Sequence, residues 1–235
     1  MKPYQQVMIA DCGEPLVPIP VEVFARVTPH PYEKLGAPYG SRSPFYVRQD
    51  VLDRLFAAQH WLQRTCPNWK ILIFDAYRPL EVQQFMVDYA FAEEVERRGL
   101  TKNALTEQQR QEITQLMQEF WAVPNPDPAK PPPHSTGGAI DVTLVDETGQ
   151  PVDMGSPIDE LSPRSYPNHF ANSLAQPEQT FHQNRELLRQ AMTQAGFMQH
   201  WGEWWHFCYG DQMWAWLKHQ VDNSFPAIAR YGRVL

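Results

Sequence analysis

Cysteine is scarce in this 235-residue sequence, which contains only Cys12, Cys66 and Cys208. Three widely separated cysteines are too few for a disulfide framework or for a zinc site built from cysteine alone. Their odd number also fits a reducing compartment, where no cysteine needs a covalent partner. We therefore expect a fold that is held together by its core and not by disulfide bonds.

Long apolar runs are also missing. The first 20 residues, MKPYQQVMIADCGEPLVPIP, lack the run of about 7–15 apolar residues that a signal peptide needs. No other stretch approaches the ~20 apolar residues that cross a bilayer. These absences predict a soluble, cytoplasmic protein that has no membrane partner.

Runs of basic residues are absent as well, and the formal net charge is −7. A protein that binds nucleic acid needs clustered Lys and Arg to neutralise phosphates, so nucleic acid is excluded as a main partner. Aromatic residues are plentiful, with 8 Trp, 9 Tyr and 12 Phe, so a sizeable core can form. The 22 prolines indicate long, ordered loops rather than a helical bundle.

Helical and strand patterns alternate irregularly along the chain, without a repeating strand–helix–strand rhythm. Residues 1–45 are predicted to form an extended N-terminal arm with short strands such as VEVFARV, and residues 123–133 form a proline-rich loop. The pattern favours one α+β domain over residues 1–235, with a mainly antiparallel sheet flanked by helices. The predicted helices cover 50–66, 79–99, 106–121 and 181–196, and the predicted strands cover 70–79, 139–145, part of 146–154, and 204–210.

Residues 134–141 read H-S-T-G-G-A-I-D and place a histidine seven residues before an aspartate. A histidine nitrogen and a carboxylate oxygen are both good zinc ligands. The two glycines allow the chain to bend, so His134 and Asp141 can converge on one ion beside the strand that follows. This motif predicts two ligands of a zinc site at the sheet.

A catalytic zinc ion takes a third protein ligand and leaves one position for water. His206, at the end of E-W-W-H, is the candidate for the third ligand. Glu203, three residues earlier, is the candidate general base that activates the water and later protonates the leaving amine. Two imidazoles and a carboxylate suit zinc, although cobalt or nickel could occupy the same site.

Each of these motifs has a plainer interpretation when it is taken alone. His134 could be a solvated loop histidine, and Asp141 could be a turn or capping carboxylate. Glu203 and His206 could form a structural polar pair among the neighbouring tryptophans. The hypothesis of a catalytic metal site therefore depends on the motifs occurring together.

A third motif, F-D-A-Y-R-P at residues 74–79, places Arg78 at the end of a predicted buried strand. Arg78 could simply pair with Asp75 at the end of the strand. It could also face the oxyanion that forms when water attacks a carbonyl group, where a fixed cation stabilises the transition state.

The three motifs follow one another in the chain, with V-D-M-G at 152–155 between the last two. Together, over about residues 50–210, they resemble the D-alanyl-D-alanine dipeptidases, which include the vancomycin-resistance dipeptidases. The resemblance implies that Glu203 is the catalytic base and acid and that Arg78 stabilises the tetrahedral transition state. It implies one zinc ion, held by His134, Asp141 and His206.

The resemblance also implies a small closed cavity that admits a free dipeptide. Asp159, which follows V-D-M-G, matches the acidic position expected to meet the ammonium group of the substrate. The family pattern S-x-H-x-x-G-x-A-x-D has a serine where this chain has Pro132. A contact made by that serine in relatives would be missing in this chain or would come from Ser135 or Thr136.

The activity predicted from these features is zinc-dependent hydrolysis of D-alanyl-D-alanine, a building block of the bacterial cell wall, to two D-alanines. One alternative keeps the chemistry but acts on longer peptidoglycan peptides as a D,D-carboxypeptidase. A second alternative is a non-catalytic, zinc-binding recognition domain of the same fold. The presence of both Glu203 and Arg78 argues against the second alternative, because a binding module needs neither a base nor an oxyanion partner.

Overall fold

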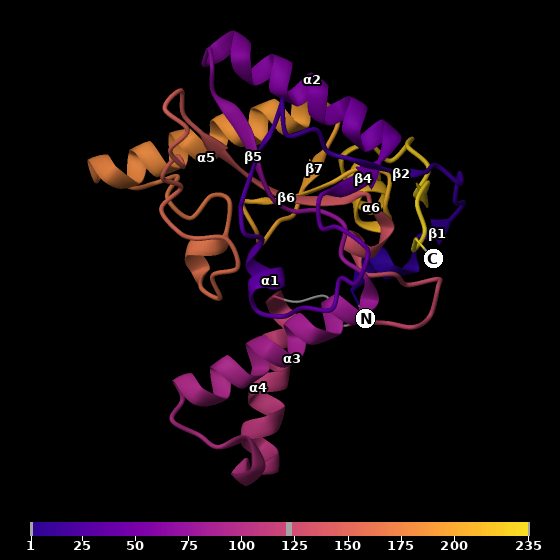
Figure 1. Ribbon diagram of the computed structural model, residues 1–235, viewed down its shortest axis with the longest axis vertical. Helices are drawn as coiled ribbons and strands as arrows, with labels where there is room; N and C mark the ends of the chain where they lie inside the picture. The colour runs from indigo at the N-terminus through magenta and orange to yellow at the C-terminus, as the bar shows by residue number, and fades with distance from the viewer. Residues whose placement is uncertain (1, 121–123, 235) are drawn as a thin grey trace.

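A five-stranded sheet lies at the centre of the computed structural model, which describes residues 2–120 and 124–234 (Figure 1). The middle strand, β6, is buried along its whole length, so both faces of the sheet are covered. The strands lie in the order β3 (Ala25–Arg26), β5 (Lys70–Asp75), β6 (Ala139–Val145), β8 (His206–Cys208) and β7 (Met198–Gln199).

This sheet is mixed, so the prediction of a mainly antiparallel sheet was wrong. β5, β6, β8 and β7 pair antiparallel, but β3 runs parallel to β5, with Ala25 opposite Leu72. The connection between β3 and β5 contains α2 (Gln49–Thr65), which carries the chain back so that β5 enters the sheet in the direction of β3. The alternation in VEVFARV indicates a strand but does not specify the direction of its partner.

Two small sheets fasten the N-terminal arm to the rest of the chain. β2 (Leu16–Pro18) pairs antiparallel with β4 (Tyr46–Arg48), and β1 (Met8–Ile9) pairs parallel with β9 (Ile228–Ala229). The arm also contains the short helices η1 (Pro3–Gln6) and α1 (Pro31–Lys34). The strand predicted within 146–154 is reduced to an isolated bridge between Val145 and Pro151.

The apolar face of the central sheet is covered by α2 and α5 (Gln176–Gln194), which lie side by side (Figure 1). Side chains on a strand alternate between its two faces. Val142 and Leu144 therefore share the apolar core, whereas Asp141 lies on the opposite face. The buried residues of this layer include Leu55, Leu62, Ile71, Ile73, Val142, Leu144, Leu188 and Met192.

A β-bulge in β5 turns one more carboxylate toward the face that carries Asp141. Ile73 lies opposite Val142, but the register then shifts by one residue, so Asp75 lies opposite Asp141. An extra residue in one strand re-aims the side chains that follow it. Without the shift, Asp75 would point to the same side as Ile73, into the apolar layer.

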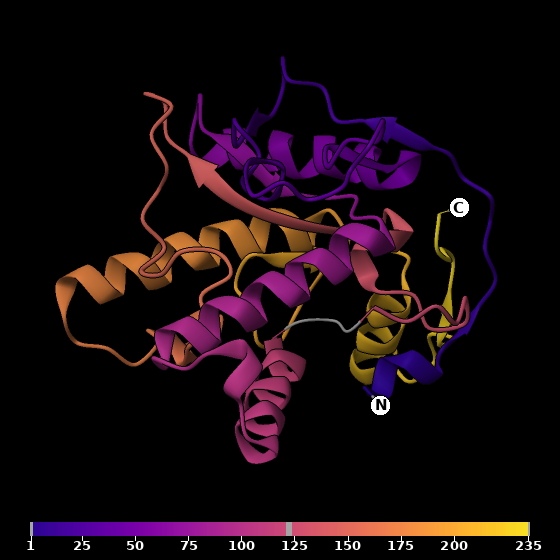
Figure 2. The same ribbon diagram turned by 60° about the horizontal axis from the view of Figure 1, so that its bottom comes forward.

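Two helices, α3 (Leu80–Arg97) and α4 (Glu107–Phe120), pack against each other and extend together away from the central sheet (Figures 1 and 2). The hydroxyl of Thr106 accepts the Gln109 N–H at 3.2 Å and so caps the start of α4. Trp121, the predicted end of this helix, and residue 123, the predicted start of the proline-rich loop, lie outside the described residues. The short helix η2 (Lys102–Ala104) lies between α3 and α4.

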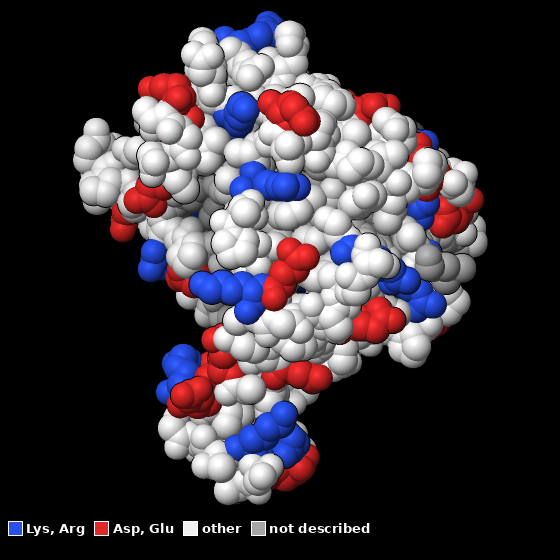
Figure 3. All heavy atoms as spheres, viewed as in Figure 1, with Lys and Arg blue, Asp and Glu red and all other residues white. Residues whose placement is uncertain are grey.

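The C-terminal part of the chain contains α6 (Gln212–Val221), a helix that the sequence analysis did not predict. The carboxylate of Asp211 caps it by accepting the Trp214 N–H at 2.8 Å, and η1 packs against it. The remaining short helices are η3 (Pro133–Thr136) and η4 (Pro163–Ser165). Among the described residues, no helix combines the length and apolar character needed to cross a membrane. Acidic and basic side chains are interspersed over the face shown in Figure 3.

Candidate active site

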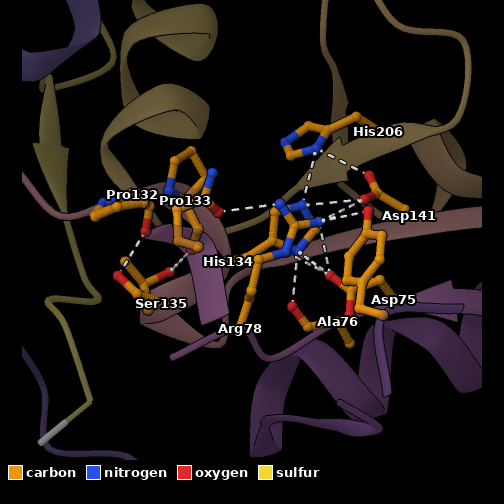
Figure 4. Close-up of polar contacts among 12 residues, drawn as sticks. Asp75, Ala76, Arg78, Pro132, Pro133, His134, Ser135, Asp141 and His206 are labelled. Carbon is orange, nitrogen blue, oxygen red and sulfur yellow. Dashed lines mark hydrogen bonds and ion pairs between the residues drawn. The ribbon is translucent and has the colours of Figure 1, made fainter. Parts of the chain in front are cut away.

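Three segments bring His134, Asp141 and His206 together on the polar face of the sheet (Figure 4). Asp141 on β6 and His206 on β8 are direct cross-strand partners, so sheet pairing alone makes them neighbours. His134 lies in η3, immediately before β6. One nitrogen or oxygen atom of each side chain lies within 4.8 Å of the others, and all three residues are buried.

The atoms that face one another in this cluster are well defined. Asp141 Oδ2 lies 3.3 Å from His134 Nε2, and Asp141 Oδ1 lies 3.0 Å from His206 Nδ1. The two histidine nitrogens are 3.2 Å apart. His134 Nδ1 lies 2.7 Å from the carbonyl oxygen of Ala76, which fixes this nitrogen as the donor and leaves the Nε2 lone pair for the cluster.

This donor set fits a divalent metal ion. Two imidazole nitrogens and a carboxylate oxygen point at a common centre inside a buried site, and such a set is typical of catalytic zinc. A cation would also separate the nitrogens of His134 and His206, which otherwise face each other at close range. The described residues therefore contain a candidate metal site where the sequence motifs predicted one.

The H-S-T-G-G loop is shaped by its own hydrogen bonds and by tight packing. Gly137 ends η3 with φ of +72°, a conformation that favours glycine. A Cβ atom on Gly138 would lie 2.6 Å from the carbonyl oxygen of Tyr209, so the loop presses directly against the chain beyond β8. The bend that brings His134 beside Asp141 therefore depends on glycine at both positions.

Ser135 lies on the side of this loop away from the cluster (Figure 4). Its hydroxyl donates to the carbonyl oxygen of Pro132 at 2.7 Å, and the hydroxyl of Thr136 donates to that of Pro133 at 2.6 Å. Both hydroxyl groups thus close the turn. A contact of Ser135 with substrate stays a prediction, and the described geometry gives it no direct support.

Arg78 is buried and makes hydrogen bonds or ion pairs with several polar side chains. Its Nε donates to Asp75 Oδ2 at 2.9 Å, and its Nη2 lies 3.4 Å from Asp141 Oδ2. The same guanidinium donates to Gln83 Oε1 at 3.0 Å and to the hydroxyl of Tyr32 at 3.2 Å. Arg78 therefore makes the strand-end pair with Asp75 and also reaches the candidate metal site.

Burial and neighbouring charges together set the protonation states of these groups. Burial alone would lower the pKa of Arg78, but the oxygen atoms of Tyr32, Asp75 and Asp141 raise it above its ordinary value. Burial would raise the pKa of Asp141, but His134 and His206 lower it well below its usual range. Burial lowers the pKa of His206, so its neutral, metal-binding form is favoured.

Replacing Arg78 with methionine is expected to lower the free energy of unfolding by about 3–5 kcal/mol, because it leaves the buried carboxylates of Asp75 and Asp141 without their cation. Urea denaturation monitored by circular dichroism measures the change.

Arg97→Met is the matched control for this substitution. The Arg97 side chain is 70 % exposed, and Arg98 remains to pair with Glu94. The urea midpoint is expected to change far less than for Arg78→Met. Equal changes in the urea midpoint for the two variants would contradict the conclusion that Arg78 stabilises the fold by pairing with buried carboxylates.

Glu203 lies in the loop between β7 and β8, beside the cluster. Its Oε2 is 3.8 Å from Nδ1 of His206 and 3.8 Å from Nδ1 of His200. Burial, assisted by the negative charge of Asp141, raises the pKa of Glu203 to about 8. A carboxyl group whose pKa lies near neutrality can both accept and release a proton.

Asp159 occupies another part of the same site. It accepts a hydrogen bond from the hydroxyl of Tyr32 at 2.7 Å, and Tyr32 in turn accepts from Arg78. Burial, with a further contribution from Asp141, raises the pKa of Asp159 to about 6. The structure thus connects Asp159 to the metal cluster through the hydroxyl of Tyr32 and the guanidinium of Arg78.

A small cavity of about 50 Å³ opens onto the cluster. The predicted residues His134, Asp141, His206, Glu203, Arg78 and Asp159 all line it, whereas Ser135 is not among its lining residues. The other residues that line the cavity are Lys2, Tyr4, Gln83, Pro133, Glu160, Leu161, His200, Trp205 and Met213.

Two further residues of the site were missed in the sequence. Tyr32 carries the hydrogen bond to Asp159, and His30 Nε2 lies 3.1 Å from Asp75 Oδ1. His30 is 2 % exposed, so it belongs to the buried polar groups around Asp75. The one available signal was the proximity of a histidine and a tyrosine within H-P-Y, which is too weak to identify either residue.

Comparison with known proteins gives matches over most or all of the chain. A family model described as D-ala-D-ala dipeptidase matches residues 25–229. A protein of Synechocystis sp. named D-alanyl-D-alanine dipeptidase is 51 % identical over 240 residues, which cover 100 % of this chain and 97 % of that protein. A protein of the same name from Enterococcus faecium is 32 % identical over 146 residues, which cover 62 % of this chain and 64 % of that protein.

Proposed function

Because the chain belongs to the D-alanyl-D-alanine dipeptidase family, we propose that it hydrolyses D-alanyl-D-alanine to two D-alanines as a zinc metallopeptidase. The observation that carries this proposal is the convergence of three metal-ligand side chains, a carboxyl group and a buried guanidinium on one small cavity. In the proposal, the zinc ion is held by His134 through Nε2, by His206 through Nδ1 and by one carboxylate oxygen of Asp141.

When bound, zinc supplies Lewis-acid chemistry, which makes water a better nucleophile and polarises a carbonyl group. The side chains of the protein move the protons. Glu203 accepts a proton from the attacking water as the new C–O bond forms. It then returns that proton to the nitrogen of the leaving D-alanine as the C–N bond breaks. The distance of 3.8 Å from Glu203 Oε2 to His206 Nδ1 keeps the carboxyl group beside the metal site.

Arg78 is proposed to stabilise the negative charge that develops on the carbonyl oxygen of the substrate. Its guanidinium borders the cavity 3.4 Å from Asp141 Oδ2, and its hydrogen bonds to Asp75 and Gln83 hold it in place. A cation that is fixed before the reaction needs no reorganisation as charge develops. The same Arg78 that stabilises the fold would therefore also stabilise the transition state.

Asp159 is proposed to bind the ammonium group of the substrate. It borders the cavity, and the hydroxyl of Tyr32 orients its carboxylate through a 2.7 Å hydrogen bond. The arrival of an ammonium group would favour the charged form of this carboxyl group, because an opposite charge lowers its pKa. The pairing would select substrates that have a free amino group.

The size of the cavity favours a dipeptidase over a D,D-carboxypeptidase that acts on longer peptides. Its walls come from the N-terminal segment around Lys2 and Tyr4, from the Asp159–Leu161 loop, and from α6 through Met213. Walls on these sides favour a short free peptide over a longer one. A non-catalytic recognition domain is less well supported, because it would need neither Glu203 nor Arg78 beside the metal ligands.

The proposed function predicts strong discrimination between D-alanyl-D-alanine and N-acetyl-D-alanyl-D-alanine. Acetylation removes the ammonium group and leaves Asp159 buried without its partner, so kcat/KM is expected to fall at least about 100-fold. Release of free D-alanine from each compound, measured with zinc-loaded protein, gives the ratio.

Each alternative function predicts a different result in the same assay. A D,D-carboxypeptidase would hydrolyse the acetylated compound at least as well as the free dipeptide. A recognition domain would bind zinc and hydrolyse neither compound. The variant Asp159→Asn tests the same contact. It is expected to reduce the ratio of kcat/KM for the free dipeptide to kcat/KM for the acetylated one, because an amide cannot form an ion pair with an ammonium group.

A further inference from the structure

We propose that the ammonium group of Lys2 binds the carboxylate of the substrate and so makes a free C-terminus a requirement for cleavage. This assignment rests on the proposed function, because it gives the direction in which the dipeptide lies in the cavity. Lys2 belongs to none of the motifs in the sequence, and it reaches the site from the opposite end of the chain to Glu203 and His206.

Most of the charged side chains that line the cavity are acidic. Among the described residues that line it, Lys2 and Arg78 are the two basic side chains other than histidine, and four others are carboxylic acids. Arg78 is already committed to Asp75, Asp141, Gln83 and Tyr32. A dipeptide brings one carboxylate with it, and that carboxylate needs a cation inside a low-dielectric site.

The ammonium group of Lys2 is not paired with another side chain among the described residues. Within the described parts of the chain, it makes no hydrogen bond and no ion pair, although its backbone N–H donates to Gln5 Oε1 at 3.1 Å. Burial lowers the pKa of Lys2, and the charge of Glu203 counteracts this effect. An ammonium group that is partly withdrawn from water without a paired anion is a good receptor for an incoming one.

Lys2 and Asp159 reach the cavity from different parts of the chain. Lys2 precedes η1, which packs on α6, whereas Asp159 is held by Tyr32 of α1. Lys2, Glu203 and Asp159 all line the cavity. The lining thus offers a basic side chain from the N-terminal segment and an acidic side chain from the Asp159–Leu161 loop, with Glu203 in the same cavity.

This arrangement matches the charge pattern of a dipeptide. Two extended residues span about 7 Å, with an ammonium group at one end, a carboxylate at the other and the peptide bond between them. With the ammonium group at Asp159 and the carboxylate at Lys2, the peptide bond lies beside Glu203 and the candidate metal ligands. The opposite orientation would place each end of the substrate beside a like charge.

The test compares D-alanyl-D-alanine with its C-terminal amide, using full-length protein that carries no N-terminal tag. Lys2→Met is expected to raise KM for the dipeptide about 10- to 100-fold, with a small change in kcat, because a charge-assisted hydrogen bond is lost. The amide lacks the negative charge and can accept only a weaker hydrogen bond from Lys2, so its KM is expected to rise far less. The difference in KM between the acid and the amide should therefore be much smaller in Lys2→Met than in the wild-type protein.

Two further variants separate binding from a structural effect. Lys2→Arg keeps the positive charge and is expected to restore much of the preference for the acid. Lys34→Met removes an exposed lysine of α1 and is expected to leave KM unchanged for both substrates. An acid-to-amide ratio that is the same in wild type and Lys2→Met would overturn the assignment of Lys2. A wild-type protein that hydrolyses neither compound would instead overturn the proposed function itself.

Discussion

Replacement of Glu203 by glutamine is expected to lower kcat for D-alanyl-D-alanine by about 10²–10⁴-fold, because the amide has nearly the same shape but cannot accept a proton. The zinc content of the protein is expected to remain unchanged, because Glu203 is not one of the three proposed ligands. Steady-state kinetics and metal analysis on the same preparation measure both quantities.

The same substitution at Glu186 provides a matched control. Glu186 lies on α5 and pairs with Arg189, outside the cavity. Glu186→Gln is expected to keep the kinetics of the wild-type protein. If Glu203→Gln retained zinc and also hydrolysed the dipeptide at the wild-type rate, Glu203 would not be the general base.

Removal of the metal ion is expected to abolish hydrolysis, by more than about 10³-fold, because several kcal/mol of transition-state stabilisation are lost with it. Addition of zinc to the chelated protein should restore activity. His206→Ala should give the same loss without chelation, since Asp141 and His134 alone offer an incomplete site.

Thermal stability provides a second readout of the metal site that does not depend on turnover. A ligand present at 100 times its Kd stabilises the folded state by about 2.7 kcal/mol, so zinc should raise the Tm of the wild-type protein. The Tm of His206→Ala should respond much less. Full activity after chelation, together with a Tm that does not respond to zinc, would contradict a metal site at His134, Asp141 and His206.

The elements that could be predicted from the sequence are those with a strong local pattern. AIDVTLV forms β6 over the predicted residues because β-branched and apolar side chains favour a buried strand. The amphipathic pattern that begins near Asp50 likewise gives α2. In contrast, α6 was not predicted, although Asp211 caps its first turn.

The parts of the site that could be predicted are those in short motifs. His134 and Asp141 share one loop and strand, so their proximity follows from local geometry. Lys2 and Tyr32 could not be predicted in the same way, because both lie more than 100 residues before His134, the first of the candidate metal ligands. Contacts of this kind depend on how the N-terminal arm wraps the sheet, and no local pattern encodes that path.

Because of the register shift in β5, the position of Asp75 beside the site depends on the number of residues in that strand. Ile73 and Asp75 point to opposite sides only because the strand contains one residue more than its partner. Deleting one residue between Lys70 and Ile73, with Ile73 still opposite Val142, would turn the residues before the deletion to the other face of the sheet, because side chains alternate along a strand. Natural variation in chain length should therefore accumulate in the surface loops of such proteins and spare this strand, even though its first four residues do not line the cavity.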